Sequence, residues 1–312
     1  MFAYIVRRLW QMIPTLLGVI LLVFFLFKQF GGDPAEILGG LNATPEQIAS
    51  IRDQLGLNQP VWYQLWLFVK SVFTFDWGNS WATGQSVSKL MIERVPATLT
   101  VMVPLLILEV LLAIPIAMWV AYRRGSLADR TVMIITTVAL SISLLVYVIV
   151  FQWLFAFQLG WFPVQGWTGS FWTNLLVYTP LPVLVAVLVA LAPQTRLYRS
   201  FFLDEIGQDY VRTARAKGLG ERVILFKHVF RNATIPILTT IGVLLPGIFV
   251  GSFLLEVFFS IPGLGREIVV AVNRSDYPVI QAVTVYLAAL TMIINLLVDI
   301  AYKLVDPRVV LK

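Results

Sequence analysis

Long apolar runs alternate with shorter polar stretches along the whole chain. A helix of roughly 20 apolar residues crosses a hydrocarbon core about 30 Å thick, and each run is long enough for that. The pattern therefore predicts six transmembrane helices, of which the fourth is the shortest and contains Pro180 and Pro182. The runs cover residues 9–30, 96–122, 131–157, 175–192, 235–259 and 279–301.

Composition supports this interpretation. Of the 312 residues, 59% are hydrophobic and 13% are charged, and the mean hydropathy is +0.84. These values exclude a water-soluble globular domain and predict an all-α membrane protein. Cysteine is absent, which excludes a disulfide framework and a thiolate metal site.

The basic residues predict the orientation of the chain. Most of the 23 Lys and Arg residues fall in one set of alternating loops, together with the two ends of the chain. Cytoplasmic loops carry the excess of positive charge in membrane proteins of this kind. Both termini and the strongly basic region 196–232 are therefore expected in the cytoplasm.

The loop between the first two runs, residues 31–95, is the large region expected outside the cytoplasm. Thr44 is a candidate N-cap before Pro45, and the stretch "VWYQLWLFVKSVF" predicts an amphipathic helix with Trp62 and Trp66 on its apolar side. Such a helix suits the membrane interface. These short helices either cover the structure or form part of a docking surface.

Inside the basic region lies the stretch "DYVRTARAKGLGERV", which begins at Asp209. Leu203, Ile206, Tyr210 and Ala214 follow helical spacing and predict a short amphipathic helix. Gly218 is expected to end it in a left-handed turn, after which a helical pattern resumes. The charges either set topology alone, or the helix rests on the membrane or inserts into a groove of a soluble partner.

Polar side chains inside the runs are candidates for a transport pathway, because charge in a bilayer is costly and tends to face a cavity or a partner. Glu109 lies in the middle of its run, while Glu256 and Asp299 lie nearer helix ends, where solvation or pairing is easier; Asp299 has Lys303 four residues on. The alternative role of such groups is helix packing. The candidates for lining a pathway are Glu109, Ser141, Ser143, Tyr147 and Gln152.

No stretch fits the phosphate-binding pattern G-x-x-x-x-G-K-[ST], so the chain is expected to hydrolyse no ATP by itself. His228 is the one histidine, and it is expected to pack or hydrogen-bond rather than serve as a base or ligand. No catalytic residue and no metal site are therefore predicted.

The chain resembles the permease subunits of ATP-binding-cassette importers, in the version typical of peptide and nickel uptake (the dipeptide/oligopeptide permease family), and within it the "B"-type subunit. The likeness begins with "DYVRTARAKGLGERVILFKHVFRNATIPIL" and extends along the chain. One departure is Gly-Gly-Asp-Pro where the family usually has Pro-Gly-Asp-Pro. The other matching strings are "YIVRRLWQMIPTLLGV", "GGDPAEILGG", "FDWGNSWATGQSV", "RVPATLTV", "FSIPGLGREIV", "RSDYPVIQA" and "NLLVDIAYKLVDPRV".

The resemblance implies a type I importer permease fold in a bacterial inner membrane. Its expected partners are a second homologous permease chain, two cytosolic ATPase subunits, an extracytoplasmic binding protein and the lipid bilayer, with no nucleic acid. This chain would hold no cofactor, since ATP and Mg would bind to the partner subunits. The residues implied to couple it to the ATPase are Asp209, Tyr210, Arg212, Thr213, Ala214, Arg215, Ala216, Lys217 and Gly218.

The implied organisation has four parts. Residues 1–30 form the cytoplasmic N-terminus and first span, and residues 31–95 form the extracytoplasmic loop region. Residues 96–304 form a core of five helices that includes the coupling loop 196–232, and residues 305–312 form a cytoplasmic tail.

Di- or oligopeptides are the expected substrates, and uptake of nickel, glutathione or antimicrobial peptides by the same architecture is an alternative. A quinone-facing subunit of a respiratory complex is less favoured, because such a subunit would carry acidic cytoplasmic loops and paired intramembrane acids. A secondary carrier is disfavoured by the lack of two repeated halves.

Overall fold

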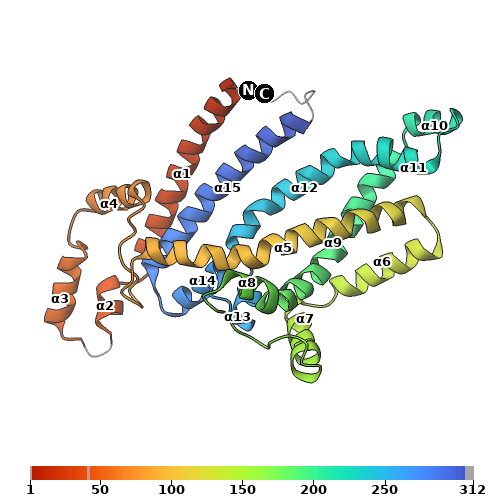
Figure 1. Ribbon diagram of the computed structural model, residues 1–312. Coiled ribbons are helices and arrows are strands. Elements are labelled where there is room, and N and C mark those ends of the chain that lie inside the picture. The colour runs from red at the N-terminus through yellow and green to blue at the C-terminus, as the bar shows by residue number, and fades with distance from the viewer. Residues whose placement is uncertain (1, 41–42, 306–312) are drawn as a thin grey trace.

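The computed structural model describes residues 2–40 and 43–305 and is helical throughout. Figure 1 shows long helices gathered side by side, with shorter helices at their ends. Within the described residues, five helices are long and apolar enough to cross a membrane, and a bent helix pair raises the number to six if it counts as one span. The predicted tail from residue 306 onward lies outside the described residues.

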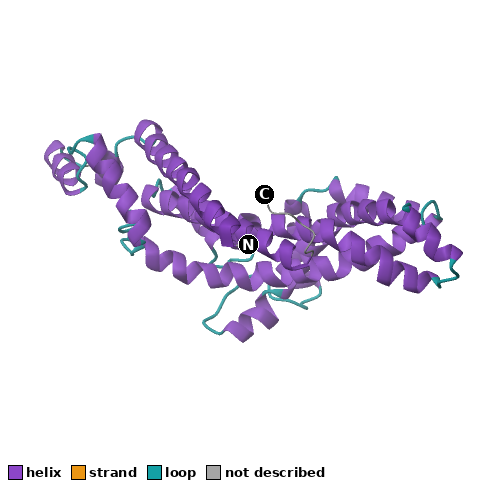
Figure 2. Ribbon diagram, turned by 90° about the horizontal axis from the view of Figure 1, so that it is seen from above, coloured by secondary structure: helices purple, strands orange, loops and turns teal. Residues whose placement is uncertain are grey.

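Helix bounds follow the apolar runs, with extensions. Within the described part of the chain, one isolated β-bridge joins Asn79 and Ser86, and Figure 2 shows helices and loops elsewhere. The long helices are α1 (Phe2–Phe30), α5 (Val87–Tyr122), α9 (Pro180–Ile206), α12 (Phe230–Val250) and α15 (Tyr277–Val305). The shorter ones are α2 (Pro34–Gly39), α3 (Pro45–Gln54), α4 (Val61–Thr74), α6 (Leu127–Leu140), α7 (Leu144–Phe151), α8 (Phe171–Thr173), α10 (Asp209–Ala216), α11 (Glu221–Val223), α13 (Phe253–Phe258) and α14 (Leu264–Asn273), and the π-helical turns are η1 (Gln152–Gln158), η2 (Asn174–Tyr178) and η3 (Ile224–Val229).

The uninterrupted hydropathy of the third apolar run suggested one straight helix, but the structure has two. The run divides into α6 and α7, which meet at an angle of 93°. Ser141 closes α6 and Ser143 starts α7, so two residues that weaken helices lie at the break. Apolar content alone does not report such a bend.

The fourth span is longer than expected and shifted toward the C-terminus. Its helix α9 begins at Pro180, where a proline fits the first turn, and continues to Ile206 rather than ending at residue 192. Part of the expected coupling loop is therefore helical. The fifth run similarly divides into α12 and α13, separated at Gly251 and Ser252.

Three buried clusters show how the helices pack. One cluster joins α5, α7, α9 and α13, a second joins α5, α9, α10, η3 and α12, and a third joins α1, α5, α14 and α15. Figure 1 shows α5 crossing the molecule beside α9, in agreement with their shared clusters. The start of α1 lies beside the end of α15, where Tyr4 Oη donates to Asp299 Oδ2 at 2.8 Å and Arg8 Nη2 lies 3.6 Å from the same oxygen.

Asp299 thus contacts α1, and its predicted pairing with Lys303 concerns a side chain that lies outside the described residues. The loop region before α5 matches its prediction more closely. Thr44 caps α3 through a capping box with Gln47, and Pro45 is the first helical residue. Buried Asp276, just before α15, fastens the end of this region by accepting from Ser80 Oγ and from the backbone N–H groups of Trp81 and Ala82.

Candidate coupling site

The helix α10 ends in a glycine turn, as the sequence predicted. Gly218 has φ of +74°, and its N–H donates to Arg215 O at 2.9 Å, while Leu219 N–H donates to Ala214 O at 3.2 Å. This pair of bonds is the Schellman arrangement, in which a left-handed residue satisfies the last carbonyl groups of a helix. An added Cβ at Gly218 would meet no heavy atom within 4 Å, so the backbone angle and not space explains the glycine.

One face of α10 is buried against the rest of the chain. Val211 and Ala214 pack into the cluster that joins α5, α9, η3 and α12, with Ile224 and Val229 among their neighbours. The residues of the predicted stripe pack against this cluster, but they do not form one helix. Leu203 and Ile206 belong to the end of α9, because the chain breaks at Gly207 and Gln208, and the fully buried Val211 was missed.

The opposite face of α10 is open. Arg212 pairs with Asp209 at 3.3 Å while both side chains stay largely exposed, and Thr213 Oγ1 donates to Asp209 O. Arg215 makes two bonds to Glu221 at 2.9 and 3.3 Å, across the glycine turn. The exposed members of the predicted coupling set are Asp209, Arg212, Thr213, Arg215, Ala216, Lys217 and Gly218.

Tyr210 connects α10 to the end of α9. Its Oη donates to Glu205 Oε2 at 2.7 Å. Burial, followed by this hydrogen bond to a carboxylate, raises the pKa of Tyr210 to about 12, so the hydroxyl stays protonated and remains a donor. Tyr210 and Ala214 therefore fasten the helix to the chain, which leaves the other members of the set accessible.

A partly buried ion pair near the same end was missed from the sequence. Arg199 on α9 donates from Nε and Nη2 to the two carboxylate oxygens of Asp129 at 2.8 and 2.7 Å, and Gly125 N–H donates to Asp129 as well. This bidentate geometry fixes the start of α6 against α9. The two residues lie 70 positions apart, and their spacing gave no signal of a contact.

Several of the candidates for a pathway bond to nearby backbone oxygens. Ser141 Oγ donates to Thr137 O and Tyr147 Oη donates to Ala139 O, so both side chains serve the bend between α6 and α7, where Ser143 is exposed. Gln152 Nε2 donates to the backbone oxygens of Val164 and Phe258. These bonds are ordinary packing roles for polar groups in spans.

Glu109 lies apart from the other candidates, on α5. It is buried, and its Oε1 has no hydrogen-bond partner among the described residues. Tyr198 on α9 is near enough to interact with it electrostatically. An unpaired buried carboxyl group is costly, which sets this position apart from the backbone-bonded hydroxyls of α6 and α7.

Glu256 is hydrogen-bonded rather than solvated, and pairing was one of the two alternatives expected from its place near a helix end. It is 1% exposed, and its Oε1 accepts from Thr98 Oγ1 at 2.9 Å while Oε2 accepts from Arg266 N–H at 2.7 Å. Thr98 Oγ1 in turn accepts from Leu264 N–H at 2.8 Å. The carboxyl group therefore joins α5, α13 and the start of α14.

These features define a multi-span helical permease with an anchored helix at one end. The chain belongs to the family of inner membrane components of binding-protein-dependent transport systems, which matches residues 113–311, and the N-terminal component of the same family matches residues 1–102. The resemblance to importer permeases is thereby confirmed. Members of this family are multi-pass inner membrane proteins that lack ATPase activity and work with a binding protein and an ATPase.

Named relatives align over nearly their full length. The chain is 36% identical to a probable peptide ABC transporter permease of Sinorhizobium fredii over 98% of both chains. It is 32% identical to a dipeptide transport system permease of Alkalihalophilus pseudofirmus and 35% identical to a glutathione transport system permease of Salmonella choleraesuis, over 99% of each chain.

Proposed function

We propose that this chain forms half of the membrane pathway of an ATP-driven peptide importer and receives the movement of the ATPase through the outer face of α10. The observation that carries the proposal is the two-sided character of α10. One side is packed into the ends of three long helices, and the other side presents charged and small residues that are exposed within the described part of the chain. A push on such a helix moves the spans to which it is packed.

The proposed orientation places both termini and α10 in the cytoplasm. It is supported by the concentration of Lys and Arg in those segments. Single cysteines test it well because the natural chain has none. In intact cells, an impermeant maleimide should label Cys at Asn79 or Ser275, and should label Cys at Gly220 only after permeabilisation; labelling of Gly220 in sealed cells would overturn the orientation.

The proposed substrates are short peptides. The relatives named for peptide, dipeptide and glutathione transport share 32–37% identity with this chain, and glutathione is itself a tripeptide derivative. A substrate of this class explains all of those names. Nickel uptake is the second candidate within the same architecture.

The proposed assembly contains a second, homologous permease chain, two ATPase subunits that hold ATP and Mg, and an extracytoplasmic binding protein. The region from α2 to α4 projects beyond the ends of the long helices in Figure 1 and is the proposed contact with the binding protein. Purified alone, the chain should hydrolyse no ATP. A transport-active homodimer without an ATPase would contradict this composition.

A cross-linking experiment tests the coupling site directly. Cys at exposed Ala216 on α10 should be captured by a short cross-linker together with the ATPase in the assembled importer. Cys at exposed Arg124, in a different loop at the same end, is the matched control. Equal capture from both positions would argue against α10 as the docking helix, and uptake of labelled di- and tripeptides into proteoliposomes would test the substrate class.

A further inference from the structure

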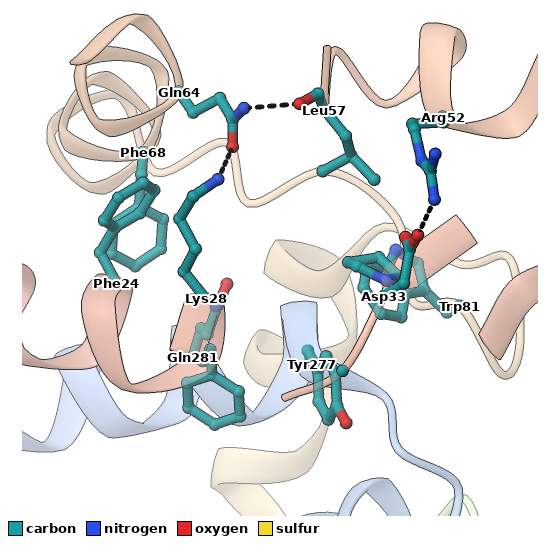
Figure 3. Close-up of a pocket in the computed structure, with 13 residues that line it drawn as sticks. Phe24, Lys28, Asp33, Arg52, Leu57, Gln64, Phe68, Trp81, Tyr277 and Gln281 are labelled. Carbon is teal, nitrogen blue, oxygen red and sulfur yellow. Dashed lines mark hydrogen bonds and ion pairs between the residues drawn. The ribbon is translucent and has the colours of Figure 1, made fainter. Parts of the chain in front are cut away.

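A partly enclosed pocket of about 420 Å³ lies where α1 ends, between α4, the α2–α3 segment and the start of α15. Figure 3 shows Lys28, from the last turn of α1, pointing into this space. Its Nζ donates to Gln64 Oε1 at 2.8 Å. Gln64 is oriented for this contact because its Nε2 donates to the backbone oxygens of Leu57 and Gln59.

Lys28 has no carboxylate partner within ion-pair distance among the described residues, so two of its three N–H donors and its full charge remain available. The one acidic residue of the pocket wall is Asp33, and it is already occupied by Arg52 (Figure 3). Burial alone would raise the pKa of Asp33, but the hydrogen bond and charge of Arg52 and the Ala35 N–H lower it below its ordinary value. The pocket therefore keeps a net positive charge.

The remaining wall is aromatic. Phe24 and Phe68 lie with ring centroids 5.9 Å apart, and Phe27 and Tyr277 lie 5.3 Å apart. On the other side of Lys28 is a second hollow of about 470 Å³, lined by the apolar side chains of Phe25, Leu26, Phe30 and Val61. Lys28 thus lies between a pocket with charged and aromatic walls and an apolar groove.

The position of α4 places this arrangement at the membrane surface. Trp62 is 74% exposed, and Trp66 and Phe73 are exposed as well, all on a helix that packs along the end of α1. Exposed tryptophans on an amphipathic helix are typical of the boundary between lipid and water. Molecules with both an anionic group and an apolar body, such as phospholipids, are present at this boundary.

We propose that the pocket binds the headgroup of an acidic phospholipid, with its phosphate at Lys28 and its acyl chains in the apolar groove between α1 and α4. A small soluble anion would satisfy Lys28 but would leave the groove unfilled. The site is independent of what the protein transports. It would fasten the α2–α4 region to the membrane surface, because Gln64 on α4 and Lys28 on α1 share the bound group.

Native mass spectrometry of the purified assembly tests the proposal. After exchange into phosphatidylglycerol, the parent should retain at least one lipid that Lys28→Gln retains about fivefold more weakly, since a basic residue near anionic headgroups contributes about 1 kcal/mol. Lys70→Gln is the matched control. It removes the same charge from exposed α4 without touching either hollow, and it should not change retention.

Two further measurements decide the ligand class. Phosphatidylcholine with the same acyl chains should be retained equally by parent and variant, and Lys28→Arg should restore phosphatidylglycerol retention. Equal retention of phosphatidylglycerol by the parent and Lys28→Gln would overturn the site. Displacement of the bound lipid by millimolar inorganic phosphate or by a short peptide would overturn the lipid as its ligand.

Discussion

Two glycines with nearly the same backbone angle have opposite surroundings. Gly218, after α10, has φ of +74°, and an added Cβ would lie in open space. Gly251, between α12 and α13, has φ of +75°, but its Cβ would lie 2.2 Å from Glu256 Oε1 and 2.8 Å from Thr98 Cγ2. The first glycine serves a turn that another molecule can approach, and the second serves a junction that the chain itself fills.

The difference extends to the neighbouring residues. An added Cβ at Gly263 would lie 2.4 Å from Glu256 Cδ, too close for a side chain, and one at Gly265 would be tight at 3.0 Å from Oε2, so three glycine backbones surround one carboxyl group. By contrast, α10 is held from one side, mainly by Val211 and Ala214. The junction at Glu256 is therefore determined by packing within the chain, whereas the outer face of α10 is left for a partner.

The largest effect is expected from Gly251→Val. A β-branched residue at positive φ costs about 1–2 kcal/mol, and overpacking against Glu256 and Thr98 costs about 1–3 kcal/mol more. Expression of folded protein and its thermal unfolding midpoint should both fall strongly. Gly251→Ala, with one carbon, should be damaging for the same two reasons but less so, and a parent-like midpoint for the valine variant would contradict the packed junction.

Glu256→Ala is expected to come next. It leaves Thr98 Oγ1 and the Arg266 N–H without their acceptor, and each unsatisfied buried donor costs about 1–3 kcal/mol. Glu256→Gln keeps the shape and one acceptor oxygen and should lose about half as much stability. The measurement is the unfolding midpoint in detergent, and equal midpoints for the two variants would show that the hydrogen bonds contribute little.

The sequence predicted well what depends on local chemistry. It predicted the six apolar runs, the cap at Thr44 and the turn at Gly218, because hydropathy, capping and positive φ act over a few residues. It did not predict the bend at Ser141, since an apolar run has the same composition whether it is straight or bent.

Contacts between distant residues were also beyond the sequence. The place of Glu256 near a helix end left solvation and pairing both open, and its partners come from α5 and α14. The bond between Arg199 and Asp129 joins segments that tertiary packing alone brings together. At α10, the spacing that suggested Leu203 and Ile206 continued across a break at Gly207, so the predicted stripe belongs to two helices, although its residues pack against one cluster.

Gly218→Val should affect activity more than folding. The strained turn costs about 1–2 kcal/mol, but no neighbour is displaced, so abundance and assembly should remain close to those of the parent. Transport and substrate-stimulated ATP hydrolysis should fall together because the orientation of α10 changes. Gly220→Val is the matched control: Gly220 also lies in open space, yet its φ of −65° accepts any residue. If the two variants transport equally well, the turn at Gly218 has no part in coupling.

The smallest effect is expected from Arg212→Ala, which tests the exposed face of α10. Arg212 pairs with Asp209 while the two side chains are 75% and 94% exposed, and exposed ion pairs contribute less than about 1 kcal/mol.

Arg215 is less exposed and bonds Glu221 through two nitrogens across the turn, so Arg215→Ala should lower coupled ATP hydrolysis more than Arg212→Ala does. The measurement is ATPase activity of the reconstituted importer at low and high salt, normalised to assembled protein. Salt should reduce the difference between the two variants, because it screens exposed charges. A severe loss from Arg212→Ala that persists at high salt would mean that Arg212 itself is buried against the partner.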